Sequence, residues 1–185
     1  MPGIVGIISR QPAAEKARQV KAMAATLRHE PFYKAGDFAA PDLGVHAGWT
    51  AHEGSFAAGQ VFQNESQDVA LIFSGECFID AAAKNQLRQG GHSFSETGGE
   101  ALVHLYEEQG DHFFGKLNGL FSGLLIDRRK KKVFLFNDRY GMERIYWHET
   151  HDGFYFASEA KALLRVRPEL REFDRQGVAE FLGVG

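Results

Sequence analysis

The feature that most constrains the fold is a series of short β-prone segments, each bounded by turn-forming residues. The first, Gly3–Ser9 (GIVGIIS), is β-branched and is followed by polar residues and Pro12, a pattern typical of a buried strand that ends in a turn. Further strands are expected at residues 43–49, 59–62, 69–73, 120–127, 133–138, 145–148 and 154–157. Because Gly, Asn, Ser and Asp separate these runs, we predict antiparallel strands with tight connections.

Helical segments are expected between the strands. Ala13–Leu27 is rich in Ala, Lys, Arg and Glu and places Ala17, Val20, Met23 or Ala24, and Leu27 at helical spacing, which predicts an amphipathic helix against a sheet. Four further helices are expected at residues 80–89 (capped by Asp80), 99–109, 158–164 (capped by Ser158) and 174–181 (capped by Asp174).

The length and pattern together predict one domain of α+β class. Residues 28–42 contain two prolines and no clear period, so we expect an irregular surface loop there. Two layers of mostly antiparallel strands covered by helices make an α+β sandwich. A chain of 185 residues with 44% hydrophobic content can form one substantial core, which favours a single domain over residues 1–185.

Composition argues against several classes of partner. The net charge is −3, and the one basic run, residues 128–132, fits a solvated hairpin turn, so nucleic-acid binding is not expected. The longest apolar stretches are far shorter than the roughly 20 residues of a membrane helix, and no basic region precedes the first apolar segment. A single cysteine, Cys77, cannot form an internal disulfide. We therefore expect a cytoplasmic protein that spans no membrane.

Longer strings carry a family resemblance. They are LNGLFSGLLIDRRKKKVFLFNDRYG at residues 117–141, GFYFASEAKALL at 153–164, GIVGII at 3–8, SGE at 74–76 and EALVHLYEEQGD at 100–111. In this order they closely resemble the glutaminase domain of asparagine synthetases. The resemblance implies a class II glutamine amidotransferase domain with a four-layer α/β/β/α sandwich of the N-terminal nucleophile hydrolase type. Within these strings, Asp138, Arg139 and Gly141 fit an ion pair or a turn at a strand exit.

The resemblance also implies a defined chemistry. In that family an N-terminal cysteine attacks the side-chain amide of glutamine, and its own α-amino group is the general base. An arginine holds the substrate carboxylate. An acidic residue holds the ammonium group, and an Asn-Gly pair donates to the oxyanion. Each part can be compared with one position of this chain.

The matching positions depart from that pattern. Pro2 stands where the nucleophilic cysteine is expected, and Gly48 approximately where the arginine is expected. Ser74 replaces the asparagine of the oxyanion pair, whereas Gly75 is retained. Gly98 stands in place of the acidic residue, although a shift of one residue in the alignment would let Glu96 serve. We therefore predict a domain that cannot hydrolyse glutamine.

Other reactive side chains offer few alternatives. Cys77 can point into the core and behave as a small hydrophobe. His46, His148 and His151 do not complete the three or four ligands of a metal site, so no metal is expected. If Met1 is removed, Pro2 becomes a secondary amine that could act as a base in a partly apolar pocket.

Three functions remain open at this stage. The first is a structural or docking module for an ATP-dependent amide-forming synthetase domain, in cis or on a partner protein; ATP and Mg²⁺ would bind that missing domain, and no cofactor is expected in this chain. The second is a small-ligand enzyme or sensor that uses a remodelled pocket around Pro2, which side chains such as Phe32 or Trp49 would fill if the hypothesis were wrong. The third is a free-standing binding or oligomerisation module, a homodimer included.

Overall fold

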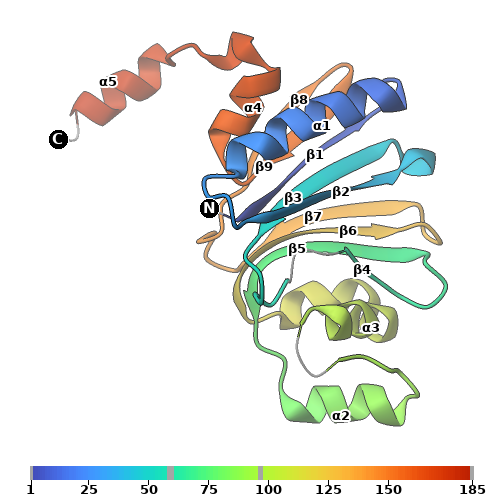
Figure 1. The fold of residues 1–185 in the computed structure, drawn as a ribbon. Coiled ribbons are helices and arrows are strands. Elements are labelled where there is room, and N and C mark those ends of the chain that lie inside the picture. The colour runs from blue at the N-terminus through green and yellow to red at the C-terminus, as the bar shows by residue number, and fades with distance from the viewer. Residues whose placement is uncertain (1, 58–60, 96–97, 184–185) are drawn as a thin grey trace.

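Two antiparallel sheets form the centre of the molecule in a computed structural model that describes residues 2–57, 61–95 and 98–183 (Figure 1). Sheet A has the strand order β2-β3-β1-β9-β8 and sheet B the order β4-β5-β6-β7. The strands are β1 (Gly3–Ser9), β2 (Lys34–Ala40), β3 (Val45–Ala51), β4 (Val61–Gln63), β5 (Val69–Cys77), β6 (Gly119–Asp127), β7 (Lys132–Asn137), β8 (Tyr146–Thr150) and β9 (Gly153–Ala157). The helices are α1 (Ala13–Leu27), α2 (Ala81–Gln89), α3 (Glu100–Gln109), α4 (Ala160–Val166) and α5 (Arg175–Gly183).

Helices cover the outer face of each sheet, so the molecule has four layers (Figure 1). The alternation of side chains along β1 explains the packing of sheet A: Ile4 lies in the core between the sheets, whereas Val5 and Ile7 pack with α1 and α4. In sheet B, Ile72 faces sheet A and Leu71 faces α3. The α+β sandwich predicted from the sequence is confirmed.

Helix α1 covers sheet A through an apolar stripe. Val20, Met23 and Leu27 are fully buried, as their spacing predicts. Lys16 is also buried, which the sequence did not indicate: its Nζ donates hydrogen bonds to the carbonyl oxygens of Ser9, at 3.0 Å, and Gly44, at 2.8 Å. The ammonium group therefore ties the start of α1 to the ends of β1 and the loop before β3.

The prediction of an irregular loop over residues 28–42 was correct for residues 28–33 and wrong for the residues that follow. Lys34–Ala40 forms the edge strand β2, which pairs along its whole length with β3, and Pro41–Leu43 is a short 3-10 helix. The segment contains Ala, Gly and Asp and no β-branched residue, so local propensity gave no sign of a strand. Backbone hydrogen bonds to the buried strand β3 stabilise this segment as a strand in spite of its low β propensity.

The helix expected to start at Ser158 begins two residues later. Ser158 does not cap α4; its Oγ accepts a hydrogen bond from the Ile4 backbone N–H at 2.9 Å, and its own N–H donates to the Ile4 carbonyl. The other elements agree with their predicted ranges to within about four residues. For the strand expected at residues 59–62, the described part is Val61–Gln63, and residues 59–60 lie outside the described residues.

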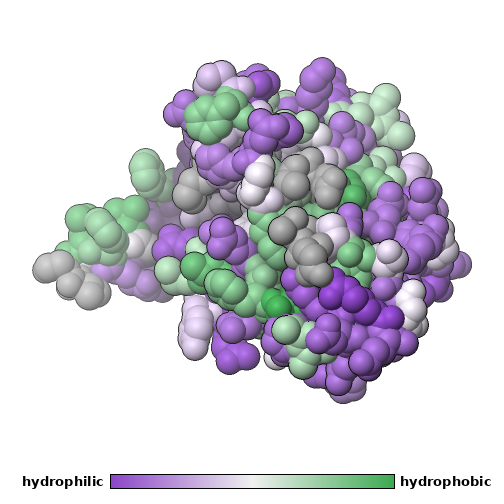
Figure 2. Space-filling model, turned by 60° about the horizontal axis from the view of Figure 1, so that its bottom comes forward, coloured by the Kyte–Doolittle hydropathy of each residue, from purple (hydrophilic) through white to green (hydrophobic). Residues whose placement is uncertain are grey.

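Helix α5 projects from the body of the domain (Figure 1). Phe181 is 81% exposed and Leu182 is 72% exposed, and Figure 2 shows apolar side chains gathered on this projecting helix. Within the part of the chain that the structure describes, no helix combines the length and the apolar character needed to cross a bilayer.

The buried carboxylate of Asp138 organises the turn after β7. It accepts hydrogen bonds from the backbone N–H groups of Tyr140, Met142 and Glu143 at 2.8–3.1 Å. Gly141 has a φ of +64°, a left-handed conformation that favours glycine. Of the two interpretations of the NDRYG string, the turn is the one seen. Burial raises the pKa of Asp138, but these hydrogen bonds outweigh it and hold the pKa below its ordinary value.

We expect this turn to make stability depend on pH. An aspartate in an unfolded chain has a pKa of about 3.9. Because the folded pKa of Asp138 is lower, its stabilisation is complete above the unfolded pKa and is lost as pH falls through the folded pKa. Urea unfolding at pH 7 and pH 3 should therefore show a smaller pH effect in Asp138→Asn than in the wild type. The exposed Glu172→Gln serves as control; an unchanged pH effect in Asp138→Asn would contradict the assignment.

Candidate functional site

An open cavity of about 740 Å³ lies beside the N-terminal end of β1. Its wall includes Pro2 from the start of the chain, His29 and Tyr33 from the segment after α1, and Ser158, Glu159 and Lys161 from the start of α4; the turn after β7 completes it. Its described lining includes neither Phe32 nor Trp49, the two residues considered as a filling for this pocket. Trp49 instead lies in the core between the sheets.

Three charged or titratable side chains meet in this cavity. His29 Nε2 lies 2.9 Å from Glu159 Oε1 and 2.8 Å from Lys161 Nζ, and Lys161 Nζ lies 2.8 Å from Glu159 Oε2. Burial raises the pKa of Glu159, but several lowering contributions, of which the hydrogen bonds from Lys161 and His29 are the largest, outweigh it and hold the pKa at about 2. Glu159 is therefore ionised at neutral pH and can hold a positive charge next to Pro2.

The cavity offers acid and base groups but no thiol among its described residues. Cys77 is 6% exposed and packs between sheet B and α3, where burial raises the pKa of its thiol. This confirms the core position considered for it. A buried thiol with a raised pKa is a poor nucleophile.

Comparison with known proteins identifies the family. The whole chain, residues 1–185, matches the family model described as "Glutamine amidotransferase domain". The chain belongs to this glutamine amidotransferase family. The resemblance to the glutaminase domain of asparagine synthetases therefore holds at the level of the family.

Individual relatives of the amidotransferase domain point the same way. It is 37% identical over 105 residues to asparagine synthetase [glutamine-hydrolyzing] 2 of Bacillus subtilis (strain 168), which covers 56% of this chain and 14% of that protein. It is 24% identical to asparagine synthetase [glutamine-hydrolyzing] 1 of the same organism, over 98% of this chain and 29% of that protein. The domain thus spans less than a third of either relative.

A solved structure supports the fold. The glutamine phosphoribosylpyrophosphate amidotransferase of B. subtilis, complexed with ADP and GMP, superposes with a TM-score of 0.69 at 18% identity, over 89% of this chain and 43% of that one. The amidotransferase domain has the N-terminal nucleophile hydrolase fold, as the resemblance implied.

Among the described residues, Pro2 alone of the predicted site positions lines the cavity. Gly48 is not part of the described lining of the cavity and faces helix α1: a Cβ at this position would contact Val20 Cγ1 at 3.0 Å and Ala24 Cβ at 3.4 Å. A side chain here would point at α1. The adjacent Trp49 is one of the residues of β3 that face the layer between the sheets.

The two positions predicted for the oxyanion pair, Ser74 and Gly75, lie in sheet B. Ser74 is buried in β5 opposite Ser122 of β6, and Gly75 follows with a φ of +103° opposite Phe121. Ile72 packs between the sheets, and Ser74, two residues on, shares that inner face. Ser74 therefore borders the layer between the two sheets, and it is not part of the described lining of the Pro2 cavity.

Gly98 lies before α3, away from the cavity. Its φ is +105°, and a Cβ there would approach the Phe56 carbonyl oxygen at 3.4 Å. Glu96, considered as a replacement for the missing acidic residue, lies outside the described residues. The structure thus brings neither Gly48 nor Gly98 to Pro2.

The charged and titratable residues that line the cavity, His29, Glu159 and Lys161, were not predicted from the sequence. His29 lies in the segment interpreted as a loop, and Glu159 and Lys161 lie within the SEAK string that was used only as a sign of resemblance. The antiparallel pairing of β1 with β9 carries the residues after β9 to the start of the chain. This pairing joins segments more than 120 residues apart, so no local pattern could indicate it.

Proposed function

We propose that this amidotransferase domain does not hydrolyse glutamine and serves as a structural or docking module for an ATP-dependent, amide-forming synthetase domain. The observation that carries the proposal is Pro2, which stands at the position of the family's nucleophile and has neither thiol nor hydroxyl. Loss of the nucleophile alone costs about 10⁶ in kcat in a well-studied hydrolase.

Changes elsewhere support the same conclusion. Gly48 cannot act as the carboxylate-binding arginine, and Gly98 offers no carboxylate for the substrate ammonium group. Ser74 has a shorter reach than the expected asparagine amide. Each of these positions departs from the pattern that the resemblance implies, so restoring cysteine at position 2 alone would leave the other departures in place. A reducing cytoplasm suits the single buried Cys77.

The partner domain is inferred from the relatives. The asparagine synthetases that the domain resembles are much longer, since it covers 14–29% of the two compared above. ATP and Mg²⁺ would bind to such a synthetase domain, in cis or on a separate protein. Helix α5 favours a docking role, because its exposed Phe181 and Leu182 offer apolar surface to a neighbouring domain.

A second candidate is a small-ligand sensor or enzyme that uses the cavity at Pro2. The observation in its favour is that the cavity is open and is lined by His29, Glu159 and Lys161. An ionised carboxylate beside an imidazole and an ammonium group can bind a charged ligand or move a proton. In this candidate function a ligand would bind beside Pro2, the position predicted for the family's nucleophile, but His29, Glu159 and Lys161 would act on it in place of a cysteine.

Calorimetry with glutamine, together with a glutamate-release assay over a day, separates the two. The proposal expects no release by the wild type, and the same result with Pro2→Ala. Glutamine binding without release, lost in Glu159→Gln but kept in the exposed control Glu169→Gln, would favour the sensor. Release that disappears in Pro2→Ala would contradict the proposal and identify an amidase with Pro2 as its base.

A further inference from the structure

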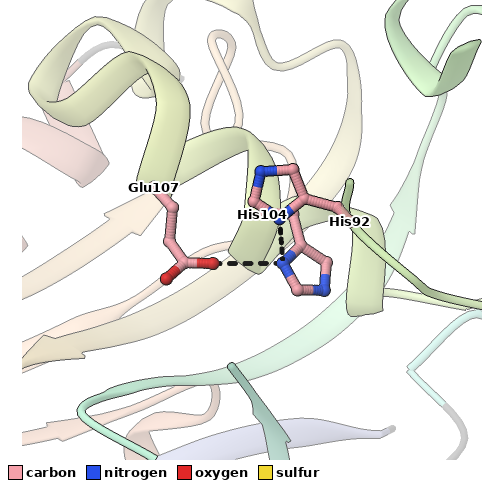
Figure 3. Close-up of side chains that lie close together, drawn as sticks. All are labelled: His92, His104 and Glu107. Atoms are coloured by element: carbon pink, nitrogen blue, oxygen red, sulfur yellow. Dashed lines mark hydrogen bonds and ion pairs between the residues drawn. The ribbon is translucent and has the colours of Figure 1, made fainter. Parts of the chain in front are cut away.

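A second cluster of titratable side chains lies on the far side of sheet B from Pro2. His104 and Glu107 are one turn apart on α3, and His92 faces them from the segment between α2 and α3 (Figure 3). One ligand atom from each residue lies within 4.8 Å of the other two.

The local sequence fixes the place of His92. Helix α2 ends in a Schellman motif, in which the N–H of Gly91 donates to the Arg88 carbonyl at 3.0 Å and the N–H of His92 donates to the Leu87 carbonyl at 3.1 Å. Gly91 has a φ of +93°, which this motif requires at that position. The backbone thus directs His92 back towards α3.

The three ligand atoms converge at a spacing suited to a metal ion. His92 Nδ1 lies 3.0 Å from His104 Nδ1, which lies 3.1 Å from Glu107 Oε2 (Figure 3). In a tetrahedral zinc site with ligand bonds near 2.0–2.1 Å, neighbouring ligand atoms lie about 3.3 Å apart. The third pair, one ligand atom each of His92 and Glu107, lies within 4.8 Å, so these two side chains would approach each other when an ion binds.

The hydrogen bonds around the cluster leave lone pairs pointing inwards. Glu108 Oε1 lies 2.9 Å from His92 Nε2 and accepts its N–H, so Nδ1 of a neutral His92 carries a lone pair. His104 Nδ1 faces both that lone pair and the Glu107 carboxylate. A single proton on His104 Nδ1 would have to be shared between the two, whereas a cation can satisfy all three atoms.

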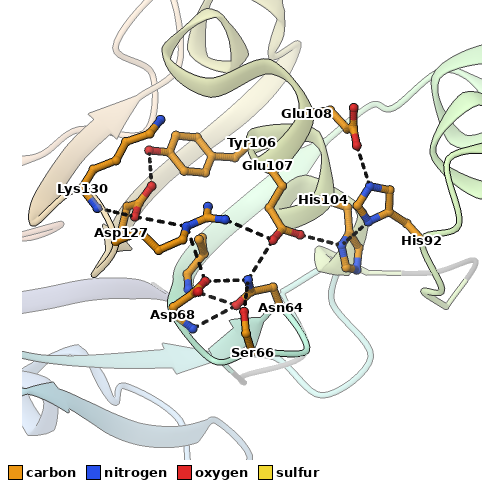
Figure 4. A network of polar contacts seen from close by, with 12 residues as sticks. Asn64, Ser66, Asp68, His92, His104, Tyr106, Glu107, Glu108, Asp127 and Lys130 are labelled. Atoms are coloured by element: carbon orange, nitrogen blue, oxygen red, sulfur yellow. Dashed lines mark hydrogen bonds and ion pairs between the residues drawn. The ribbon is translucent and has the colours of Figure 1, made fainter.

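A polar network holds the carboxylate in place (Figure 4). Glu107 Oε1 accepts a hydrogen bond from Asn64 Nδ2 at 2.8 Å, and Arg129 lies 3.7 Å away. Asn64 is itself bonded to Asp68. In known metal sites, hydrogen bonds of this kind orient the ligands. Here the histidine N–H that faces away from the ion donates to a carboxylate, and an amide donates to the ligand carboxylate.

The cluster is accessible from one side. His104 is 3% exposed, yet it borders an open cleft of about 430 Å³ that is also lined by Ser93 and Glu100. The side chain of His92 is 17% exposed. An ion can therefore enter from solvent and keep a water molecule as a fourth ligand.

We propose that His92 Nδ1, His104 Nδ1 and Glu107 Oε2 bind a divalent transition-metal ion, with Zn²⁺ the best match to two imidazole nitrogens and one carboxylate. The ion would fasten the α2–α3 connection to α3. It would lie apart from the Pro2 cavity, so the site does not depend on the function proposed for that cavity. The sequence analysis considered His46, His148 and His151 and missed this set, although the His-x-x-Glu spacing of α3 was visible.

Zinc titration of the untagged, EDTA-treated protein against a chromophoric chelator tests the proposal. We expect one ion per chain and, at zinc concentrations about 100 times Kd, a Tm higher by about 5–10 °C. His92→Ala and Glu107→Gln should each weaken binding by more than about 100-fold, because loss of an outer-shell partner alone costs 10–100-fold. Glu108→Gln should show that smaller loss.

His112→Ala, an exposed histidine on the segment after α3, is the matched control and should bind zinc as the wild type does. Circular dichroism checks that each variant is folded, and the absorption of bound Co²⁺ reports whether nitrogen and oxygen ligands surround the ion. No binding by the wild type, or binding that is the same in His92→Ala and Glu107→Gln, would overturn the proposal and leave a shared proton as the link between the two histidines.

Discussion

Replacing Gly75 with alanine is expected to destabilise the fold by about 3–5 kcal/mol. Gly75 has a φ of +103°, and a Cβ at this position would lie 2.2 Å from the Leu120 carbonyl oxygen and 2.8 Å from the Phe121 Cα. Strain from the backbone conformation adds to a clash with the backbone of β6, which cannot move aside as a side chain could. Urea unfolding monitored by fluorescence measures the loss.

Gly54→Ala separates the two contributions. Gly54 also has a positive φ, +76°, but a Cβ there would meet no atom within 4 Å. We expect this variant to lose only the conformational part, about 1 kcal/mol. If Gly75→Ala were no more destabilising than Gly54→Ala, β6 would have relaxed around the methyl group and the clash would not be the cause.

This packing explains the glycine at position 75 without a role in the site. The resemblance assigns Gly75 to the oxyanion pair. The other member of that pair is expected to be asparagine, and Ser74 stands at its position. The close approach of β5 and β6 requires glycine at position 75 whether or not glutamine is hydrolysed. Its presence therefore agrees with a domain that keeps the family fold without the family reaction.

Asp127→Ala is expected to cost about 2–4 kcal/mol. The carboxylate is fully buried at the end of β6, where it accepts hydrogen bonds from the Tyr106 hydroxyl and from the Lys130 backbone N–H, both at 3.0 Å. Its removal leaves the Tyr106 hydroxyl buried without a partner and loosens the β6–β7 hairpin. Arg129, whose Nε lies 3.5 Å from Asp127, also loses a counter-charge and keeps Glu107, at 3.7 Å, as an acidic neighbour.

A double-mutant cycle with Tyr106→Phe isolates the buried pair. Tyr106→Phe removes only the donor and is expected to cost about 1 kcal/mol, and the double variant should lose less than the sum of the single changes. Asp111→Ala, an exposed carboxylate paired with lysines of the same hairpin, should lose less than about 1 kcal/mol. Strict additivity of Asp127→Ala and Tyr106→Phe would show that the two groups do not support each other.

Sequence patterns predicted most of the strands and helices because the buried elements carry clear apolar patterns. Val69, Leu71 and Phe73 face α3 and Ala70 and Ile72 face sheet A, so burial on both faces gives a continuous apolar run. The edge strand β2 was missed because three of its seven residues are exposed and most of its residues have low β propensity. A local sequence pattern predicts strands whose side chains are buried in the core. It does not detect a strand such as β2, which forms because its backbone pairs with β3.

The candidate sites were harder to predict than the fold. Pro2 was singled out through resemblance and lines a cavity, whereas Gly48 faces α1 and is not part of the described lining of that cavity. A shift of one residue along β3 moves a side chain from one face of the sheet to the other. An alignment that is correct to within one residue is sufficient to assign the fold. It is not accurate enough to assign the residues that bind a ligand.

The position of β1 at the centre of sheet A sets an order for folding during synthesis. Its partners are β3, which is translated soon afterwards, and β9, where Val5 pairs with Ala157. At synthesis rates of about 5–20 residues per second, the first strand waits roughly 10–30 s for its second neighbour. Sheet B, built from residues 61–137, is available earlier. The nascent chain must therefore keep one edge of its most apolar strand unpaired until nearly the whole domain has left the ribosome, which makes the closure of sheet A the step most exposed to aggregation and to chaperones.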